Sequence, residues 1–290
     1  MKLPSQKAMI LNGAAIMVVL GGAASLLRSV FDPDQTPPCS TTYTRGTLFG
    51  LEKAPGVLLT AVDLQTRLDY SEWGVVENVR IVPTKDGPAP AALRVAIPKG
   101  SINPKNPTAP KGGMGFRWRP SSVPTGTTAA CLAYSIQLPE GFEFNKGGKL
   151  PGLFGGDAPA GGKPVDGKTG FSARFMWRAK GEGEVYAYVP GAPAGRGLSI
   201  DRGKFAFPRG KWVRLEQEIV LNKPGASDGI LRVWVDGRLK IEKTDMTFRT
   251  TDTFAVTGVM ADIFYGGKTS DWAAPKDTHV MLSPFELRWR

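Results

Sequence analysis

Polar side chains that can bind an anion and transfer a proton recur in two neighbouring extended segments. Residues 171–178 and 184–189 alternate apolar and polar side chains, and the connection between them is short enough for a hairpin. Because residues two apart in a strand share a face, the polar members of both segments are expected side by side. A guanidinium binds anions and a phenol can give or take a proton, whereas the alternative interpretation is an ordinary solvated strand face. The four side chains in question are Ser172, Arg174, Tyr186 and Tyr188.

A glycine-rich segment precedes this hairpin and frames one charged side chain. Residues 147–156 read GGKLPGLFGG, and their glycines permit tight turns that few other residues allow. We expect a short helical turn near residues 152–154. A surface lysine is usually only solvated, so Lys149 becomes a candidate site residue only in combination with the hairpin.

Three segments taken together resemble the motifs of polysaccharide lyase family 14. They are residues 149–156 (KLPGLFGG), 171–178 (FSARFMWR) and 183–190 (GEVYAYVP), and the order and spacing are similar from about residue 133 to the end of the chain. The resemblance implies a β-jelly roll, which is a concanavalin A-like sandwich of two antiparallel sheets. It also implies metal-independent β-elimination on uronate polymers such as alginate or glucuronan, without a cofactor. The catalytic set that it implies is Lys149, Ser172, Arg174, Tyr186 and Tyr188.

The residues themselves are suited to this chemistry. β-Elimination removes the C5 proton of a uronate and expels the 4-O-linked sugar, so the carboxylate must be neutralised while charge builds on it. Lys149 or Arg174 can do this electrostatically. A free tyrosine has a pKa of about 10, and neighbouring cations favour the phenolate. We therefore expect Tyr188 to act as base and acid, and Tyr186 to position the sugar.

Further side chains are expected to bind other parts of an acidic polymer. Arg117 and Arg119 lie on one side of an expected strand and can bind carboxylates bidentately, although a solvated strand face is the alternative. Trp234 and Trp272 can stack on sugar rings, but a core position is favoured for a tryptophan between strand apolars. The predicted substrate-binding residues are Arg117, Arg119, Gln137 and Arg178.

The net charge limits the possible partners. Lysine and arginine number 37 against 26 aspartate and glutamate, which gives a formal charge of +11 and a pI near 9.7. Such a surplus attracts polyanions, but no run of about 5–8 basic residues marks a nucleic-acid-binding tail. We therefore expect an acidic polysaccharide as the partner, no nucleic acid, no metal ion and a monomeric protein.

Two other functional classes stay open at this point. A non-catalytic jelly-roll module that binds an acidic glycan would keep a basic groove but would need no pair of tyrosines. A glycoside hydrolase would need two carboxylates facing the scissile bond. Glu216 and Glu218 share one face of an expected strand, but the E-x-D-x-x-E pattern is missing.

The composition favours many short strands. The chain has 36 Gly and 24 Pro, which interrupt helices and punctuate strands with turns. Asp236-Gly237 between two apolar runs predicts a hairpin, because both residues tolerate positive φ. A helical turn is expected around residues 63–70, and the loops 103–113 and 155–170 are typical of functional loops. Strands are expected at 78–83, 92–97, 115–119, 129–138, 171–178, 184–189, 212–221, 229–236, 238–243, 255–265 and 279–289.

An apolar segment near the start predicts export. Lys2 and Lys7 precede the apolar stretch 8–27, which fits a signal peptide and is close to the roughly 20 residues that span a bilayer. Both interpretations place the following domain in the periplasm or the medium, and the second adds a membrane anchor. The predicted organisation is a signal peptide or anchor at 1–30, a linker at 31–45 and a single jelly-roll domain at 46–290.

The chain has two cysteines, Cys39 and Cys131. Outside the cytosol they most simply form one disulfide, and the alternative is a pair of free buried thiols. Together with the single histidine, His279, they are too few for a four-ligand Cys/His zinc site. Cys–His or Ser–His–Asp catalysis would have to use His279, close to the end of the chain.

Overall fold

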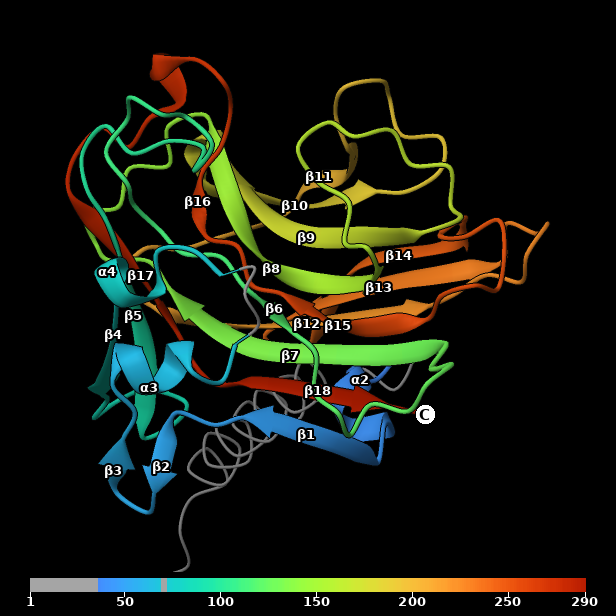
Figure 1. The fold of residues 1–290 in the computed structure, drawn as a ribbon, viewed down its shortest axis with the longest axis horizontal. Helices are drawn as coiled ribbons and strands as arrows, with labels where there is room; N and C mark the ends of the chain where they lie inside the picture. Colours follow the sequence, from blue (N-terminus) through green and yellow to red (C-terminus); the bar gives the residue numbers. More distant parts are fainter. Residues whose placement is uncertain (1–35, 69–71) are drawn as a thin grey trace, which may run out of the picture. The chain divides into compact units, whose positions relative to one another are not determined.

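Two large antiparallel β-sheets packed face to face form the body of the fold (Figure 1). The computed structural model describes residues 36–68 and 72–290, so the predicted signal or anchor at 1–30 lies outside the described residues. Within the described part, no helix is long and apolar enough to cross a membrane. The predicted all-β sandwich is confirmed.

The first sheet has nine strands among the described residues. Their order is β14–β13–β12–β7–β17–β5–β4, and β18 also pairs with β7 and carries β1 at its other edge. The strands are β1 (Arg45–Phe49), β4 (Val79–Pro83), β5 (Ala91–Ile97), β7 (Ala129–Gln137), β12 (Trp212–Val220), β13 (Gly229–Val235), β14 (Arg238–Met246), β17 (Thr278–Leu282) and β18 (Phe285–Trp289).

The second sheet has seven strands in the same described part. Their order is β11–β10–β9–β8–β15–β6, and β16 pairs with β8. The strands are β6 (Arg117–Trp118), β8 (Gly147–Gly156), β9 (Gly170–Arg178), β10 (Glu182–Tyr188), β11 (Leu198–Ala206), β15 (Val256–Met260) and β16 (Phe264–Tyr265).

Short elements connect the strands. β13 and β14 form the predicted hairpin, and Asp236 and Gly237 at its turn have φ values of 48° and 76°. A helical turn is expected at 63–70. The observed helix, α3 (Ala61–Gln65), begins earlier, where Thr60 and Asp63 form a capping box. The short elements are α2 (Cys39–Thr42), β2 (Glu52–Ala54), β3 (Val57–Leu58), α3 (Ala61–Gln65), α4 (Val75–Asn78), η1 (Ala179–Gly181) and η2 (Ser270–Trp272).

Strand alternation decides which side chains fill the space between the sheets. On β9, Phe171, Ala173, Phe175 and Trp177 belong to the main apolar core and are fully buried. Burying a large apolar side chain contributes about 1.5–3 kcal/mol, so these residues fix the side of β9 that faces inward. The polar residues between them therefore point to the other side of the seven-stranded sheet, which we call the groove face.

The glycine-rich segment 147–156 is a strand and does not contain the helical turn expected at 152–154. β8 pairs with β9 on one side and with β15 and β16 on the other. Its glycines permit this close pairing, since a Cβ on Gly152 would lie 2.0 Å from the carbonyl oxygen of Ala173. A bulge separates Lys149 from Gly152. Beside it, Gln217 of the other sheet accepts a bond from Leu153 N at 2.8 Å and donates to Ala173 O at 3.0 Å.

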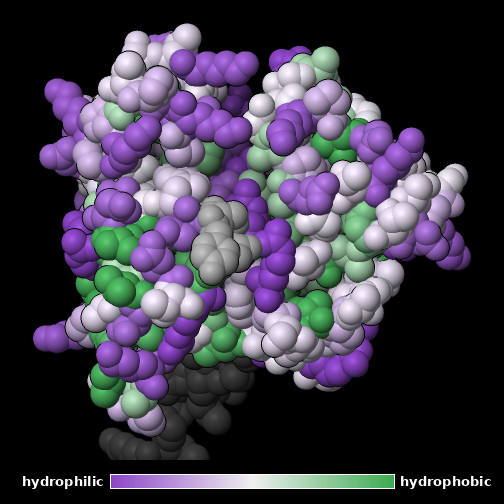
Figure 2. All heavy atoms as spheres, viewed as in Figure 1, coloured by the Kyte–Doolittle hydropathy of each residue, from purple (hydrophilic) through white to green (hydrophobic). Residues whose placement is uncertain are grey.

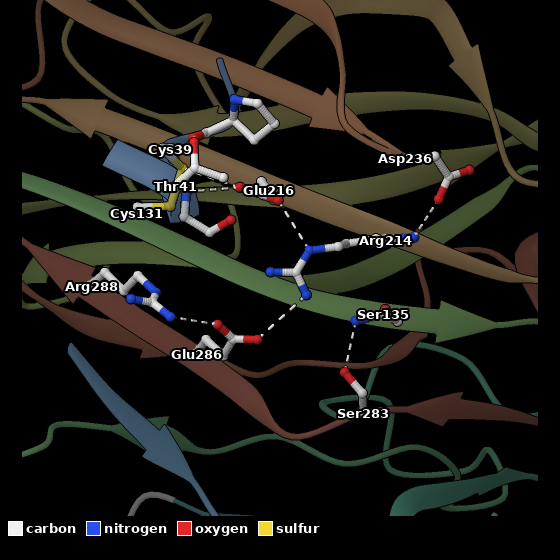
Figure 3. A network of polar contacts seen from close by, with 12 residues as sticks. Cys39, Thr41, Cys131, Ser135, Arg214, Glu216, Asp236, Ser283, Glu286 and Arg288 are labelled. Atoms are coloured by element: carbon white, nitrogen blue, oxygen red, sulfur yellow. Dashed lines mark hydrogen bonds and ion pairs between the residues drawn. A yellow bond between two sulfur atoms is a disulfide. The ribbon is translucent and has the colours of Figure 1, made fainter. Parts of the chain in front are cut away.

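The segment that precedes β1 is attached to the outer face of the nine-stranded sheet (Figure 3). Cys39 and Cys131 form a disulfide, and Ser40 N donates to Glu216 Oε2 at 2.9 Å. Tyr43 is buried, and its hydroxyl donates to Glu218 Oε1 at 2.7 Å. The sequence assigns this segment to a linker at 31–45, and through these contacts its residues from Cys39 onward are attached to the nine-stranded sheet.

Charged side chains on the same outer face are paired with one another. Arg214 bonds both Glu216 at 3.0 Å and Glu286 at 3.4 Å, and Arg288 lies 3.3 Å from Glu286 (Figure 3). Glu218 pairs with Arg232 at 2.8 Å. Glu216 and Glu218, the carboxylates considered for a hydrolase, are thus nearly buried structural groups beneath the N-terminal segment.

Candidate active site

The register of β8, β9 and β10 arranges side chains in rows on the groove face. In this antiparallel pairing, residues directly opposite one another have their Cβ atoms about 4.5–5.5 Å apart, so each row brings its side chains into contact distance. The rows are Phe154–Ser172–Tyr188, Gly152–Arg174–Tyr186 and Lys149–Met176–Glu184.

A groove of about 880 Å³ lies over these rows and is lined by members of all three. Figure 2 shows a hollow between two raised parts of the surface, and hydrophilic residues gather inside it. The loops predicted to be functional form much of its walls, together with segments near β16 and η2. Lining residues include Trp73, Lys105, Arg117, Lys149, Arg174, Met176, Arg178, Tyr186, Tyr188, Asp262, Phe264, Lys268, Trp272 and residues 157–164.

Lys149 is a nearly buried amine at the floor of the groove. Its Nζ atom lies 2.9 Å from Met176 Sδ and 3.3 Å from the centroid of the Tyr186 ring. Burial holds the pKa of Lys149 well below its usual value, and the nearby charges of Arg174 and Arg178 lower it further. This amine therefore gives up its proton at lower pH than an ordinary lysine.

Arg174 and Arg117 are joined by one buried carboxylate. Asp262 accepts from Arg174 Nη1 at 2.7 Å and from Arg117 Nη1 at 2.9 Å, one bond on each of its oxygens. The exposed fraction of Asp262 is 5%, so its charge is screened little by water. Arg174 Nε is buried and has no hydrogen-bond partner among the described residues. Asp262 thus holds two guanidinium groups together at the groove.

The two phenols lie edge to face, with ring centroids 5.9 Å apart. The Tyr188 hydroxyl accepts a bond from Gly162 N, and the Tyr186 hydroxyl accepts one from Gly197 N, both at 3.0 Å. Burial raises the pKa of Tyr186, although the Gly197 amide and the charge of Arg178 lower it. The expectation that neighbouring cations lower the pKa of both phenols is therefore wrong for Tyr186, where desolvation is the larger effect.

Ser172 lies beneath a loop and not in the groove. It is fully buried, and its Oγ atom donates to the carbonyl oxygen of Pro159 at 2.6 Å. Pro159 itself lines the groove, whereas Ser172 does not.

The four predicted substrate-binding residues divide into two groups. Arg117 and Arg178 line the groove, and Arg178 is held by Glu184 at 2.7 Å. Arg119 is exposed and stacks on the Phe154 ring at 4.9 Å, outside the groove lining. Gln137 lies at the end of β7 in the nine-stranded sheet, where it donates to Gly210 O at 3.3 Å. It does not line the groove, because β7 belongs to the nine-stranded sheet.

Asp262 is a charged groove residue that was not predicted from the sequence. It lies between β15 and β16, within the segment predicted as one long strand at 255–265. Its partners Arg174 and Arg117 are 88 and 145 positions away in the chain, so no local pattern identifies it. Of the two tryptophans, Trp234 is buried as favoured, whereas Trp272 lines the groove.

The arrangement combines anion binding with proton transfer. The guanidinium groups of Arg117, Arg174 and Arg178 and the amine of Lys149 line one groove, and the carboxylates of Asp262 and Glu184 are each already bonded to an arginine. An acidic ligand can therefore be held beside two phenols that are fixed by backbone amides.

Comparisons with known proteins match most of this chain. A family model described as Polysaccharide lyase 14 matches residues 85–285. A marine PL-14 alginate lyase from Aplysia kurodai is 30% identical, with a TM-score of 0.65 over 76% of this chain and 90% of that chain. A search of curated proteins gives no match.

Two more distant solved structures share the fold. An alginate lyase from Chlorella virus is 24% identical, with a TM-score of 0.62 over 73% of this chain and 89% of that chain. An endo-β-1,4-glucuronan lyase from the fungus Trichoderma reesei is 13% identical, with a TM-score of 0.55 over 85% and 96% of the two chains. At these identities the likeness concerns the fold alone.

Proposed function

The chain belongs to polysaccharide lyase family 14, and from this premise we propose that its groove cleaves a uronate polymer by β-elimination without a metal ion. Alginate and glucuronan are the candidate polymers, because the relatives that share the fold are named for them. The observation that carries the proposal is the juxtaposition, in one groove, of the Arg174–Asp262–Arg117 cluster and the Tyr186–Tyr188 pair.

Arg174 neutralises the uronate carboxylate, with Arg117 beside it. As the C5 proton leaves, negative charge moves onto the carboxylate oxygens, and fixed donors in a site of low dielectric stabilise this charge. Arg174 suits the task because it is nearly buried and because Asp262 holds its guanidinium in place. Lys149 suits it less, since its lowered pKa favours the neutral amine.

Tyr188 takes the C5 proton and returns a proton to the leaving oxygen. The C4–O bond breaks, a double bond forms between C4 and C5, and one proton moves from carbon to the 4-O-linked sugar. Tyr186 positions the sugar ring. A general base or acid of this kind contributes about 10²–10⁴-fold in rate.

Lys149 is a second candidate for the base. Its amine lies 3.3 Å from the Tyr186 ring centroid and lines the groove, and its lowered pKa makes an unprotonated amine available at lower pH than usual. The two assignments differ in what Tyr188→Phe does, since a lysine base would leave proton abstraction intact in that variant.

We also propose that the domain works outside the cytosol, in the periplasm or the medium. The disulfide between Cys39 and Cys131 supports this, because disulfides persist in oxidising compartments.

A substrate panel tests the lyase proposal. The full chain is incubated with alginate, glucuronan and a bacterial exopolysaccharide, and products are followed by ultraviolet absorbance and mass spectrometry. Chain shortening with new double bonds in at least one uronate polymer is expected. Binding to these polymers without any unsaturated product would instead support the non-catalytic glycan-binding module.

A further inference from the structure

Ser172 and Tyr188 both bind the same loop, residues 157–164. The two residues lie directly opposite each other in the β9–β10 pairing. Ser172 Oγ donates to Pro159 O at 2.6 Å, and Gly162 N donates to the Tyr188 hydroxyl at 3.0 Å. The loop therefore connects a buried serine to the hydroxyl of a phenol that lines the groove.

The position of the Gly162 amide is closely fixed by its neighbours. Gly162 has a φ of 82°, a conformation that residues with a side chain rarely adopt. A Cβ at this position would lie 2.6 Å from the carbonyl oxygen of Gly195, in the loop that follows β10. At the other end of the loop, Ala158 packs with Phe154 and Met260. Small movements of the loop therefore change the hydrogen bond to Tyr188.

Ser172 is poorly placed to contact a sugar. Its side chain is fully buried, and its one donor is already used by Pro159. A polymer lying in the groove meets Pro159 and its neighbours, which cover Ser172. The hydroxyl can affect a reaction in the groove only through the loop above it.

We propose that Ser172 is a positioning residue that sets the Tyr188 hydroxyl through loop 157–164, and that it does not touch the substrate. The hydroxyl holds the Pro159 carbonyl, which keeps the loop seated and the Gly162 amide directed at Tyr188. The inference rests on the proposed role of Tyr188 for its effect on rate, but the mechanical link between Ser172 and the loop is independent of that role.

Hydrogen exchange of the loop tests the link in the absence of any polysaccharide. In the full chain, Ser172→Ala and Tyr188→Phe each remove one bond to the loop, and each is expected to speed amide exchange in peptides covering 157–164 at least about fivefold. Ser283→Ala is the matched control, because Ser283 is also a buried serine that donates to a proline carbonyl, Pro284 O at 3.1 Å, in the connection between β17 and β18 of the other sheet. Unchanged exchange of the loop in Ser172→Ala would overturn the proposal.

A double-mutant cycle tests the effect on catalysis. Gly162→Ala displaces the loop directly, so Ser172→Ala and Gly162→Ala are each expected to lower kcat about tenfold, and the double variant no more than either alone. Fully additive losses would mean that Ser172 acts on the substrate or on another group. If the chain cleaves no uronate polymer, the lyase proposal fails, whereas the exchange measurement still decides the link between Ser172 and the loop.

Discussion

The amine nitrogen of Lys149 lies 3.3 Å from the centroid of the Tyr186 ring, in the row next to the one that carries Arg174. The position is nearly buried and close to two guanidinium groups, so it disfavours the charged form of lysine. An amine kept in such a place lowers the stability of the fold, which is typical of groups retained for activity.

Lys149→Met is therefore expected to stabilise the fold and to impair the enzyme. We expect the free energy of unfolding near neutral pH to rise by about 2 kcal/mol, because a polar amine that burial penalises is replaced by a similarly sized apolar side chain. Lyase activity is expected to fall at least about 100-fold if Lys149 is the base, and much less if Tyr188 is. Urea unfolding and the ultraviolet assay measure the two effects.

The stabilisation by Lys149→Met should depend on pH in a defined direction. The pKa of Lys149 is lower in the folded state than its ordinary value of 10.5, so the unfolded chain binds more protons between these two values. The stability of the unmodified protein therefore rises with pH in that interval, and the advantage of Lys149→Met shrinks as the pH approaches 10.5. Lys146→Met, at an exposed lysine, is the control, and an advantage that grows with pH would contradict this account.

The two phenols should respond differently to loss of the hydroxyl. Tyr188→Phe is expected to lower kcat by about 10²–10⁴-fold because it removes the proposed base and acid. Tyr186→Phe is expected to raise KM more than it lowers kcat, because this residue positions the sugar. Initial rates of unsaturated product on the preferred polymer measure both. Full activity in both variants would refute the assignment, and a Tyr188→Phe enzyme with nearly intact kcat would favour Lys149 as the base.

Asp262 offers a test of the buried charge cluster. Asp262→Ala leaves Arg174 and Arg117 without their shared carboxylate, so the free energy of unfolding is expected to fall by about 3 kcal/mol. We also expect kcat to fall at least about tenfold, because the guanidinium of Arg174 is no longer held in place. Chemical unfolding and initial rates measure the two effects.

Glu286→Ala is the matched control for Asp262→Ala. Glu286 also joins two arginines, Arg214 and Arg288, but its side chain is 31% exposed and lies on the outer face of the other sheet (Figure 3). We expect it to cost less than about 1 kcal/mol and to leave kcat unchanged. Equal losses of unfolding free energy in the two variants would show that burial does not make the Asp262 cluster more stabilising than the exposed Glu286 cluster.

The disulfide should matter for stability and not for turnover. Its cysteines are 92 positions apart, and closing a loop of that length in the unfolded chain stabilises the fold by about 4 kcal/mol. The double variant Cys39→Ala/Cys131→Ala should lose stability of this size in thermal unfolding. Its kcat at a temperature where it stays folded should be unchanged, because the bridge lies on the outer face of the other sheet. A lower kcat in the folded variant would mean that the N-terminal segment reaches the groove.

Most of the longer strands, and the inward side of β9, were predictable because they depend on local alternation, whereas β1, β8 and β11 were not predicted. Phe171 and Trp177 mark the core side of β9, which places Arg174 on the opposite face without any knowledge of the partner strands. Local alternation does not say which sheet a strand joins, and the strand of Gln137 joins the nine-stranded sheet. The helical turn expected around Gly152 was wrong, because glycines that suggest turns instead allow close strand pairing there.

The charge environment of the site was less predictable, because it depends on contacts distant in sequence and on burial. Asp262 reaches Arg174 only after the two sheets have formed. The pKa of Tyr186 rises because desolvation outweighs the cations that the sequence places nearby. The position of Ser172 beneath Pro159 depends on the path of a loop that has no periodic pattern.

The rows on β8, β9 and β10 and the walls of the groove come from different parts of the chain. Backbone pairing holds the rows, so inserting a single residue into any of these strands would turn its polar side chains toward the interior. The walls at 103–105 and 157–164 belong to connecting segments, which tolerate changes of length at small entropic cost. Polymer preference can therefore be re-engineered by grafting wall segments from related enzymes. The residues on β8, β9 and β10 that are proposed to act on the substrate would stay unchanged.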